Sequence, residues 1–243
     1  MRPDNVTTRP VSPVVPWAAH DIKELGHAQT HPKGLELSRQ GAMPDEVVYL
    51  GGGIVKLVRV DRDGCENILD LAFPGAWLGA AALIARTRHP VTAVTCTRTL
   101  LTRIPADVFR RLLTRHPALS SRIHQMHAYE LCRQTRRMSQ LSAFTSRQRL
   151  QQAIRQLIAA FHLPVAEGSV RLRSPLRQWE LARLIAITPE HLSRLFKTLE
   201  REGILRRERG WLIVPDVGRL CPDGEDDGVA ACDGPTSMHT FAD

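Results

Sequence analysis

The feature that most constrains the fold of this chain is a pair of short apolar patterns in residues 176–204, separated by a brief break. In each pattern the apolar side chains recur at steps of three and four residues, which places them on one face of a helix. Thr188 and Pro189 suit the N-cap and first position of the second helix, and the helix dipole favours Glu190 in its first turn. The stretch therefore predicts two helices joined by a tight turn, with buried faces formed by Trp179, Leu181, Leu184 and Ile185, and by Leu192, Leu195, Phe196 and Leu199.

The second helix has a polar outer face whose side chains match the edges of base pairs. Arginine can donate two hydrogen bonds to guanine, glutamate can accept one from cytosine, and serine can do either. In helix-turn-helix proteins the N-terminal part of the second helix lies in the major groove. A surface helix whose charges are merely solvated is the alternative. We predict that the bases are read by Glu190, His191, Ser193 and Arg194.

The residues after this helix predict a wing. Gly203 is a natural helix end, and residues 204–214 have the pattern of two short strands around a turn at Arg209-Gly210. A β-hairpin directly behind the second helix makes a winged helix-turn-helix, whose arginines can meet phosphates. The predicted phosphate contacts come from Arg177, Gln178, Thr188, Lys197, Arg206, Arg207 and Arg209.

The positive charge of the chain is concentrated on this segment. The whole chain has a formal net charge of +8 and a pI near 9.8. Residues 143–214 contain 13 Lys and Arg against 6 Asp and Glu, whereas residues 219–243 contain one Arg and six acids. This distribution indicates that the winged segment binds a polyanion, for which double-stranded DNA is the expected partner.

The N-terminal half predicts an antiparallel β domain. Short runs rich in Val, Ile and Thr lie between His27 and Ile104 and are separated by turn signals such as Asp63-Gly64 and Pro74-Gly75. Residues 51–53 are three glycines, but no strand–G-x-G-x-x-G–helix unit surrounds them, so we interpret them as a turn. Together with the helical C-terminal part, this half predicts an α+β fold.

A long helix is expected between the two domains. Residues 117–141 keep a helical period over about six to seven turns. An apolar stripe on a helix in this position favours pairing with the same helix of a second copy, and packing against the chain's own β domain is the alternative. The predicted dimer contacts are Leu119, Ile123, Met126, Met138 and Leu141.

The remaining signals give no support to a membrane, metal or catalytic role. No stretch is long and apolar enough to span a bilayer and no secretory signal is seen, so we expect a cytoplasmic protein. No nucleophile–base set, paired carboxylates or metal cluster stands out, so we do not expect an enzyme. The five cysteines lack C-x-x-C and zinc spacing, and we interpret them as reduced thiols: Cys65, Cys96, Cys132, Cys221 and Cys232.

These motifs, in this order, resemble the CRP/FNR family of bacterial transcription regulators over residues 27–217. Segments within residues 32–41 and 49–57 look like the family's entry into its β-roll and its central hairpin. Residues 74–79 look like a later turn, and motifs within residues 180–194 are similar to the DNA-binding signature. The resemblance implies a homodimeric, sequence-specific DNA-binding regulator that also meets RNA polymerase.

Composition and the resemblance together divide the chain into five segments. The two domains are connected by helices that include the long dimerisation helix, and a tail follows the second domain. We expect a mobile arm at residues 1–25, a β-roll of the cyclic-nucleotide-binding type at 26–105, the connecting helices at 106–142, the winged helix-turn-helix at 143–217 and an acidic disordered tail at 218–243.

The second helix also suggests a branch of the family. Glu190, Ser193 and Arg194 form an E-x-x-S-R pattern that looks more like the FNR/FixK branch than the cAMP receptors. That resemblance implies a palindromic site with half-sites related to TTGA. The two recognition helices of a dimer would then enter successive major grooves, about 34 Å apart.

The effector region departs from the cAMP receptors of the family. In those proteins the cyclic phosphate meets a Glu that follows a Gly and an Arg-Ser pair on the next strand. Here Gly79 is followed by Ala80, and His89-Pro90 stand at the Arg-Ser positions. Losing the Arg removes a charge that binds phosphate, and Pro90 lacks a donor N–H. The effector pocket is therefore expected to be degenerate, and cAMP is disfavoured.

No cofactor is predicted. The iron–sulfur branch of the family needs an N-terminal group of cysteines, and none precedes Cys65. Haem is left open by His27, His31, His89 and Cys96 in the β-roll. A second hypothesis, that of a ligand-binding β-roll acting as a sensor or scaffold through protein contacts, is also left open, as are the effector and the choice between activation and repression.

Overall fold

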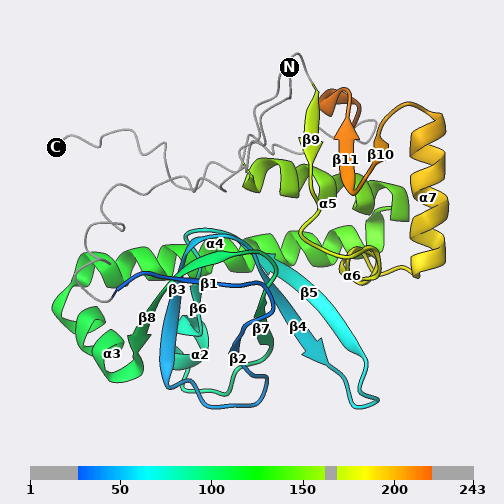
Figure 1. Cartoon of the computed structure of the whole chain (residues 1–243). Coiled ribbons are helices and arrows are strands. Elements are labelled where there is room, and N and C mark those ends of the chain that lie inside the picture. Colours follow the sequence, from blue (N-terminus) through cyan, green and yellow to red (C-terminus); the bar gives the residue numbers. More distant parts are fainter. Residues whose placement is uncertain (1–26, 162–168, 221–243) are drawn as a thin grey trace, which may run out of the picture.

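The computed structural model describes residues 27–161 and 169–220. Its N-terminal part is a β-roll of two four-stranded antiparallel sheets, with strand orders β1-β8-β3-β6 and β2-β7-β4-β5 (Figure 1). Apolar side chains from both sheets, among them Leu50, Val55 and Leu101, form one buried cluster. The elements of the roll are β1 (Gln29–His31), β2 (Glu36–Ser38), β3 (Glu46–Gly52), β4 (Val55–Val60), β5 (Glu66–Ala72), β6 (Trp77–Leu78), α2 (Ala80–Ile84), β7 (Thr92–Thr95) and β8 (Thr99–Pro105).

The β4–β5 hairpin shows how local sequence sets this architecture. Asp61 accepts hydrogen bonds from the backbone N–H groups of Asp63, at 3.0 Å, and Cys65, at 2.9 Å. Gly64 has a φ of +79°, a conformation that glycine adopts without strain. The hairpin predicted from Asp63-Gly64 is confirmed, and it places β4 and β5 side by side facing the C-terminal domain (Figure 1).

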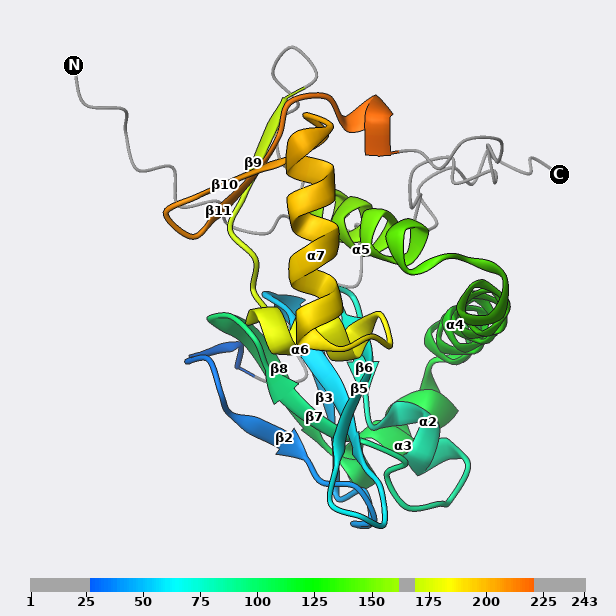
Figure 2. The ribbon, with the colours of Figure 1, turned by 90° about the vertical axis from the view of Figure 1, so that its right-hand side faces the viewer.

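Two helices connect the roll to the C-terminal domain. They are α3 (Ala106–Arg115) and α4 (Pro117–Ala143). As the sequence predicts, α4 is one continuous helix, with 27 residues. It runs along the roll and ends beside the C-terminal domain, as Figures 1 and 2 show.

The first half of α4 packs against the chain's own roll. Ile123 is only 2% exposed and lies in a buried cluster with Phe109 and Trp77, against which Leu119 and Met126 pack. The prediction that Ile123 contacts a second copy is therefore wrong, because the β-roll of the same chain covers it. Leu119 and Met126 are only partly buried, and they stay predicted dimer contacts.

The C-terminal domain is a winged helix-turn-helix, and the fold class is α+β as predicted. The Thr145 hydroxyl accepts a hydrogen bond from the Gln148 N–H and caps the first helix of the domain. The wing is a three-stranded sheet of order β10-β11-β9. The elements are α5 (Ser146–Ala160), β9 (Val170–Leu172), α6 (Gln178–Leu184), α7 (Pro189–Arg201), β10 (Arg206–Glu208), β11 (Trp211–Val214) and the 3-10 helix η1 (Val217–Leu220).

Two of the predicted segments fall largely outside this description. The N-terminal arm at residues 1–25 lies outside the described residues. The same holds for residues 221–243 of the acidic tail, whereas residues 218–220 belong to η1.

The turn between α6 and α7 contains a strained residue. Ala186 has a φ of +55°, in the left-handed region that favours glycine. The residue is exposed, and its backbone N–H donates to Arg183 O at 3.1 Å. The turn thus holds an alanine in a left-handed conformation.

Replacing Ala186 with glycine should therefore stabilise the protein. The left-handed conformation costs an alanine about 1–2 kcal/mol, and the greater freedom of glycine in the unfolded chain offsets part of the gain. We expect the free energy of unfolding to rise by about 1 kcal/mol, or the melting temperature by about 3 °C. Thermal unfolding of the two proteins measures this difference. An unchanged or lower melting temperature would show that the turn is not strained in solution.

Candidate nucleic-acid interface

Helix α7 begins with a strong cap and exposes one polar face. The Thr188 hydroxyl accepts a hydrogen bond from the His191 N–H at 3.2 Å, and Pro189 occupies the first helical position. Leu192, Phe196 and Leu199 are buried against the rest of the domain. The opposite face is therefore turned to solvent, and its exposed residues are Glu190, His191, Arg194 and Lys197, with Ser193 half-buried beside them.

Glu190 and Arg194 form the charged centre of this face. The pKa of Glu190 lies below its usual value because its own backbone N–H and the Thr188 hydroxyl hydrogen-bond to the carboxylate, and Arg194 adds a favourable charge. The carboxylate is thus an acceptor at neutral pH. The Arg194 guanidinium makes no hydrogen bond or salt bridge with the described residues, so its donors are available to a ligand.

His191 is held differently from its neighbours. Its ring Nε2 lies 3.1 Å from Ser146 Oγ, at the start of α5. The side chain is exposed, but it must give up this hydrogen bond before it can contact a base through Nε2. His191 therefore lies on the predicted face, but its ring is already hydrogen-bonded to Ser146.

The three predicted arginines of the wing are all exposed, but one of them has a partner within the domain. Arg209 and Gly210 have φ values of +47° and +85° and form the hairpin turn, as predicted, and Arg206 and Arg209 are exposed. Arg207 instead donates to both carboxylate oxygens of Glu200, each at 2.9 Å, and its guanidinium lies 4.7 Å from the centre of the Phe196 ring. The prediction that all three arginines meet phosphates is therefore revised, because Arg207 ties the wing to α7.

Strand β9 adds a basic residue that the sequence did not reveal. Arg171 pairs with Ile213, which pairs in turn with Arg206, so the two arginines stand on the same face of the wing sheet. The Arg171 guanidinium lies 5.2 Å from the centre of the Trp211 ring. Arg171 is separated from the wing hairpin by a helix-turn-helix in sequence. The alternation of apolar, Arg and apolar residues in β9 is typical of a strand. It does not indicate which other strand β9 pairs with.

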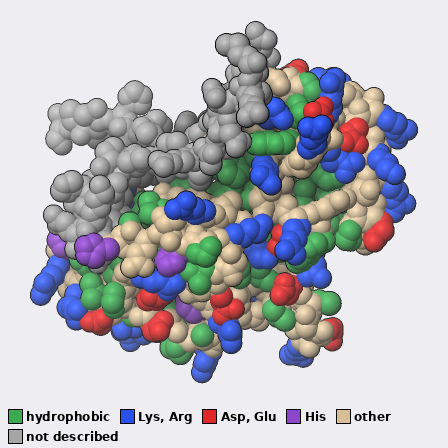
Figure 3. Space-filling view, in the orientation of Figure 1, with side chains coloured by type: hydrophobic (Ala, Val, Ile, Leu, Met, Phe, Trp, Pro, Cys, Tyr) green, Lys and Arg blue, Asp and Glu red, His purple; other side chains and the backbone are tan. Residues whose placement is uncertain are grey.

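The remaining phosphate candidates on α6 and α7 are exposed to solvent. Arg177 and Gln178 are exposed at the start of α6, and Lys197 is exposed one turn after Arg194. Figure 3 shows Lys and Arg side chains gathered along the edge of the molecule formed by α7 and the wing. The arrangement is a basic face with a recognition helix at its centre, suited to a polyanionic duplex.

The second half of α4 exposes an apolar stripe. Ala128, Leu131, Thr135, Met138 and Ser142 are all exposed and follow one another at alternating steps of three and four residues. Leu131 is 65% exposed and Met138 is 72% exposed, values that are high for large apolar side chains in a helix. We call these five residues the α4 seam. Of the predicted dimer contacts, Met138 belongs to the seam and Leu141, which is 43% exposed, lies beside it.

The effector region has His89-Pro90 at the positions where the cAMP receptors carry an Arg-Ser pair. Ala80 is fully buried, and Pro90 is exposed. Gly79 has a φ of +83° and approaches His89 so closely that a Cβ added to Gly79 would lie 3.2 Å from the His89 ring. His89 is buried, and burial lowers its pKa, although Asp45 opposes the shift. A cavity of about 140 Å³ lies beside it and is lined in part by Asp45, Glu46 and Arg39, and Arg39 forms a salt bridge with Glu36.

Within residues 27–161 and 169–220, no three His, Cys, Asp or Glu side chains gather into a group that could hold a metal ion. Cys96 is buried, and burial raises its pKa to about 11, which leaves the thiol protonated at neutral pH. In the same ranges, none of the helices combines the length and the apolar character needed to cross a membrane.

Comparison with known proteins agrees with this arrangement. The model of the cyclic nucleotide-binding domain matches residues 28–116, and that of the Crp-like helix-turn-helix domain matches residues 145–222. A probable transcriptional activator of Rhizobium leguminosarum bv. viciae is 26% identical over 82% of this chain and 83% of its own length. The transcriptional activator protein FnrL of Cereibacter sphaeroides is 24% identical over 85% of this chain and 84% of its own length.

Solved structures share the whole described fold. FixK2 from Bradyrhizobium japonicum superposes with a TM-score of 0.69 at 19% identity, covering 80% of this chain and 95% of its own. A CRP/FNR-family transcriptional regulator of Thermus thermophilus superposes with a TM-score of 0.67 at 24% identity, covering 80% and 96%. The Crp-like helix-turn-helix domain and the relatives named as transcriptional activators indicate a DNA-binding transcription regulator and not an enzyme. The chain belongs to the CRP/FNR family of transcription regulators.

Proposed function

We propose that this regulator binds DNA as a homodimer at a palindromic site with half-sites related to TTGA. The observation that carries the proposal is the exposed pair of Glu190 and Arg194 at the start of α7, flanked by the basic wing. In a TTGA half-site, Arg194 donates to O6 and N7 of the guanine, and Glu190 accepts from the paired cytosine. Ser193 adds a base contact, and His191 joins it after leaving Ser146.

Phosphate contacts fix the position of α7 along the DNA. They come from the start of α6, from α7 and its cap, and from the wing. Such contacts carry no sequence information, but they supply most of the affinity and its dependence on salt. We assign them to Arg177, Gln178, Thr188, Lys197, Arg206 and Arg209, and we add Arg171.

The α4 seam is the proposed dimer interface. A seam with heptad spacing on a helix of this length is suited to pairing with its twin. The two recognition helices would then reach major grooves about 34 Å apart, one helical turn of DNA. A regulator of this kind acts on DNA in the cytoplasm and meets RNA polymerase there.

We also propose that cAMP is not the effector. The cavity of about 140 Å³ beside His89 is smaller than typical ligand sites, which hold roughly 300–1,000 Å³. The carboxylates of Asp45 and Glu46 line it, and Arg39, which also lines it, is already paired with Glu36. A ligand present at about 100 times its Kd would stabilise the protein by about 2.7 kcal/mol. With about 1 mM cAMP, we expect no change in the melting temperature beyond that of a sodium chloride control. A rise of several degrees would contradict this assignment.

Binding assays test the central proposal. The probes are a duplex with two inverted TTGA half-sites and a duplex of the same composition in scrambled order. We expect the palindrome to bind at least about 1,000-fold more tightly near physiological salt, and both affinities to fall steeply as salt rises. Equal affinity for the two duplexes would contradict sequence recognition. Weak binding that hardly depends on salt would instead favour the sensor or scaffold hypothesis.

A further inference from the structure

The β-roll holds the first helix of the helix-turn-helix at its N-terminal end. Lys56 Nζ on β4 lies 2.5 Å from Glu180 Oε1 on α6, and the two side chains are only 15% and 6% exposed. The other carboxylate oxygen of Glu180 accepts the Arg177 N–H at 2.8 Å. Burial by itself raises the pKa of Glu180, but these hydrogen bonds and the charges of Lys56 and Lys33 leave the pKa below its usual value. The pair is therefore ionised at neutral pH.

The same helix is held at its C-terminal end through α4. Asp70 on β5 is buried, and its carboxylate forms salt bridges with Arg133 and, at 2.9 Å, with Arg137. The second nitrogen of the Arg137 guanidinium donates to Leu184 O, the last residue of α6, at 2.9 Å. Asp70, Arg137 and α6 thus form a continuous chain of directional contacts across three elements.

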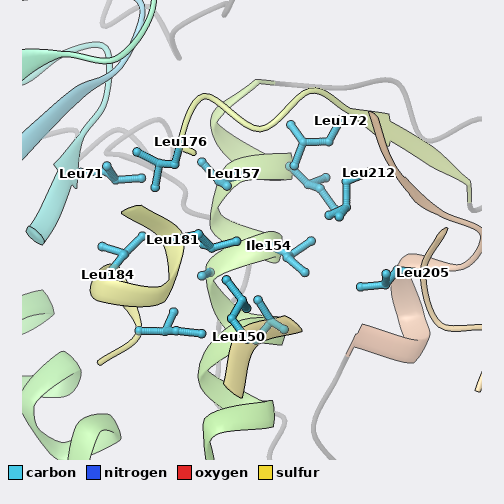
Figure 4. Close-up of a cluster of buried hydrophobic side chains, with 14 of the residues drawn as sticks. Leu71, Leu150, Ile154, Leu157, Leu172, Leu176, Leu181, Leu184, Leu205 and Leu212 are labelled. Carbon is cyan, nitrogen blue, oxygen red and sulfur yellow. The ribbon is translucent and has the colours of Figure 1, made fainter. Parts of the chain in front are cut away.

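Apolar packing fills the space between these two ends. Val58, Ile68 and Leu71 of the β-roll belong to the same buried cluster as Leu181 and Leu184 of α6. Figure 4 shows Leu71 on β5 lying beside Leu176 and close to the side chains of α6. The DNA-binding domain therefore packs directly against the β4–β5 hairpin, and the chain connection through α4 is not its only link to the β-roll.

The covalent connection alone would leave the domain free to pivot. Helix α4 ends at Ala143 and α5 begins at Ser146, and Phe144 between them has an extended backbone. Apolar contact resists separation but is not directional, whereas desolvated ion pairs tolerate only a narrow range of geometry. The ion pairs at the two ends of α6 are thus the contacts best suited to set its direction.

We propose that Lys56, Glu180, Asp70 and Arg137 form an interdomain clamp that fixes the DNA half-site spacing that the dimer accepts. These four are positioning residues, because none belongs to the DNA-contacting face. With the clamp closed, each α7 is held at one angle to α4 and hence to its twin. Specificity for spacing would then reside partly in the β-roll. This inference rests on the proposed function, namely a dimer on a palindrome.

The test measures affinity as a function of spacer length. The probes are palindromes with zero to about five inserted base pairs, half a helical turn, and a duplex with a single half-site. One variant neutralises the first pair as Lys56→Met with Glu180→Gln, in which Gln can still accept the Arg177 N–H. The second is Arg137→Lys, which keeps a charge near Asp70 but loses the planar fork. The control is Arg39→Gln, in an exposed pair with Glu36 on the same roll.

The expected results separate positioning from folding. For the wild type and Arg39→Gln, inserting about five base pairs should lower affinity by about 100-fold, because both half-sites can no longer be engaged together. For the clamp variants the loss should be less than about tenfold, while affinity for the single half-site stays unchanged. Circular dichroism checks that each variant is folded, and since the variants alter opposite ends of α6, either one decides the question if the other unfolds.

Two failures can be told apart. If the wild type does not prefer the palindrome to the single half-site, the proposed dimeric function fails. If the wild type prefers the palindrome and the folded clamp variants keep its sharp dependence on spacing, the clamp inference fails and the function stands. A uniform loss on every probe, including the single half-site, would also overturn the clamp, because it would point to damage within the DNA-binding domain.

Discussion

Replacing Leu131 and Met138 together with glutamate should convert the protein to a monomer. Both side chains are more than half exposed in the single chain, so the change costs little within one copy. In a dimer built on the α4 seam, carboxylates from both copies would face one another across a desolvated contact, which is strongly unfavourable. Affinity for the palindrome should then fall by about 100-fold, to the level of a single half-site. Sedimentation and DNA binding measure the two effects.

Tyr129→Glu is the matched control for this double change. Tyr129 is 55% exposed on the same helix, but its position lies outside the heptad steps of the seam. The control should remain dimeric and keep its affinity. If Tyr129→Glu dissociated the protein and the double change did not, the dimer would be built on a different face of α4.

Replacing Arg194 with alanine should remove most of the sequence preference. Each bidentate contact to a guanine contributes roughly 1–3 kcal/mol of discrimination, so affinity should fall by roughly tenfold to hundredfold per half-site. The effect is present in both half-sites of the palindrome. Binding to scrambled DNA should change little, because that binding depends on phosphate contacts. Competition between the two duplexes gives the ratio directly.

Lys197→Ala serves as the comparison for this change. Lys197 lies on the same face of α7 and is assigned to a phosphate. Its loss should weaken specific and non-specific binding alike and lower the slope of affinity against salt by about one. If Arg194→Ala behaved in the same way, with equal losses on both duplexes, Arg194 would be a phosphate ligand and not a base reader.

The parts of the fold that could be predicted are those set by local signals. Thr188-Pro189 starts α7 and Gly203 ends it, because capping depends only on neighbouring backbone groups. The Asp63-Gly64 and Arg209-Gly210 turns depend on local backbone conformation in the same way. The order of these signals was enough to place the recognition helix and the wing.

The wrong predictions concern which part of the molecule packs against a given helix face or pairs with a given side chain. The stripe of Leu119, Ile123 and Met126 indicates a buried side of α4, but periodicity does not say whether the cover is the roll or a second copy. Arg207 was placed with the wing arginines because its pairing with Glu200 depends on how the wing packs against α7, which spacing along the chain does not show. The Lys56–Glu180 pair joins residues 124 positions apart and could not be inferred from spacing.

The most direct test of this account is protection of guanine N7 from methylation on the palindromic duplex. N7 lies in the major groove, where Arg194 of each copy should cover it. We expect the guanine of each TTGA half-site to be protected by the wild type, and protection at both guanines to be lost with Arg194→Ala under conditions where the variant still occupies the DNA. Guanines that remain reactive in the wild-type complex, or protection that survives without Arg194, would contradict the account.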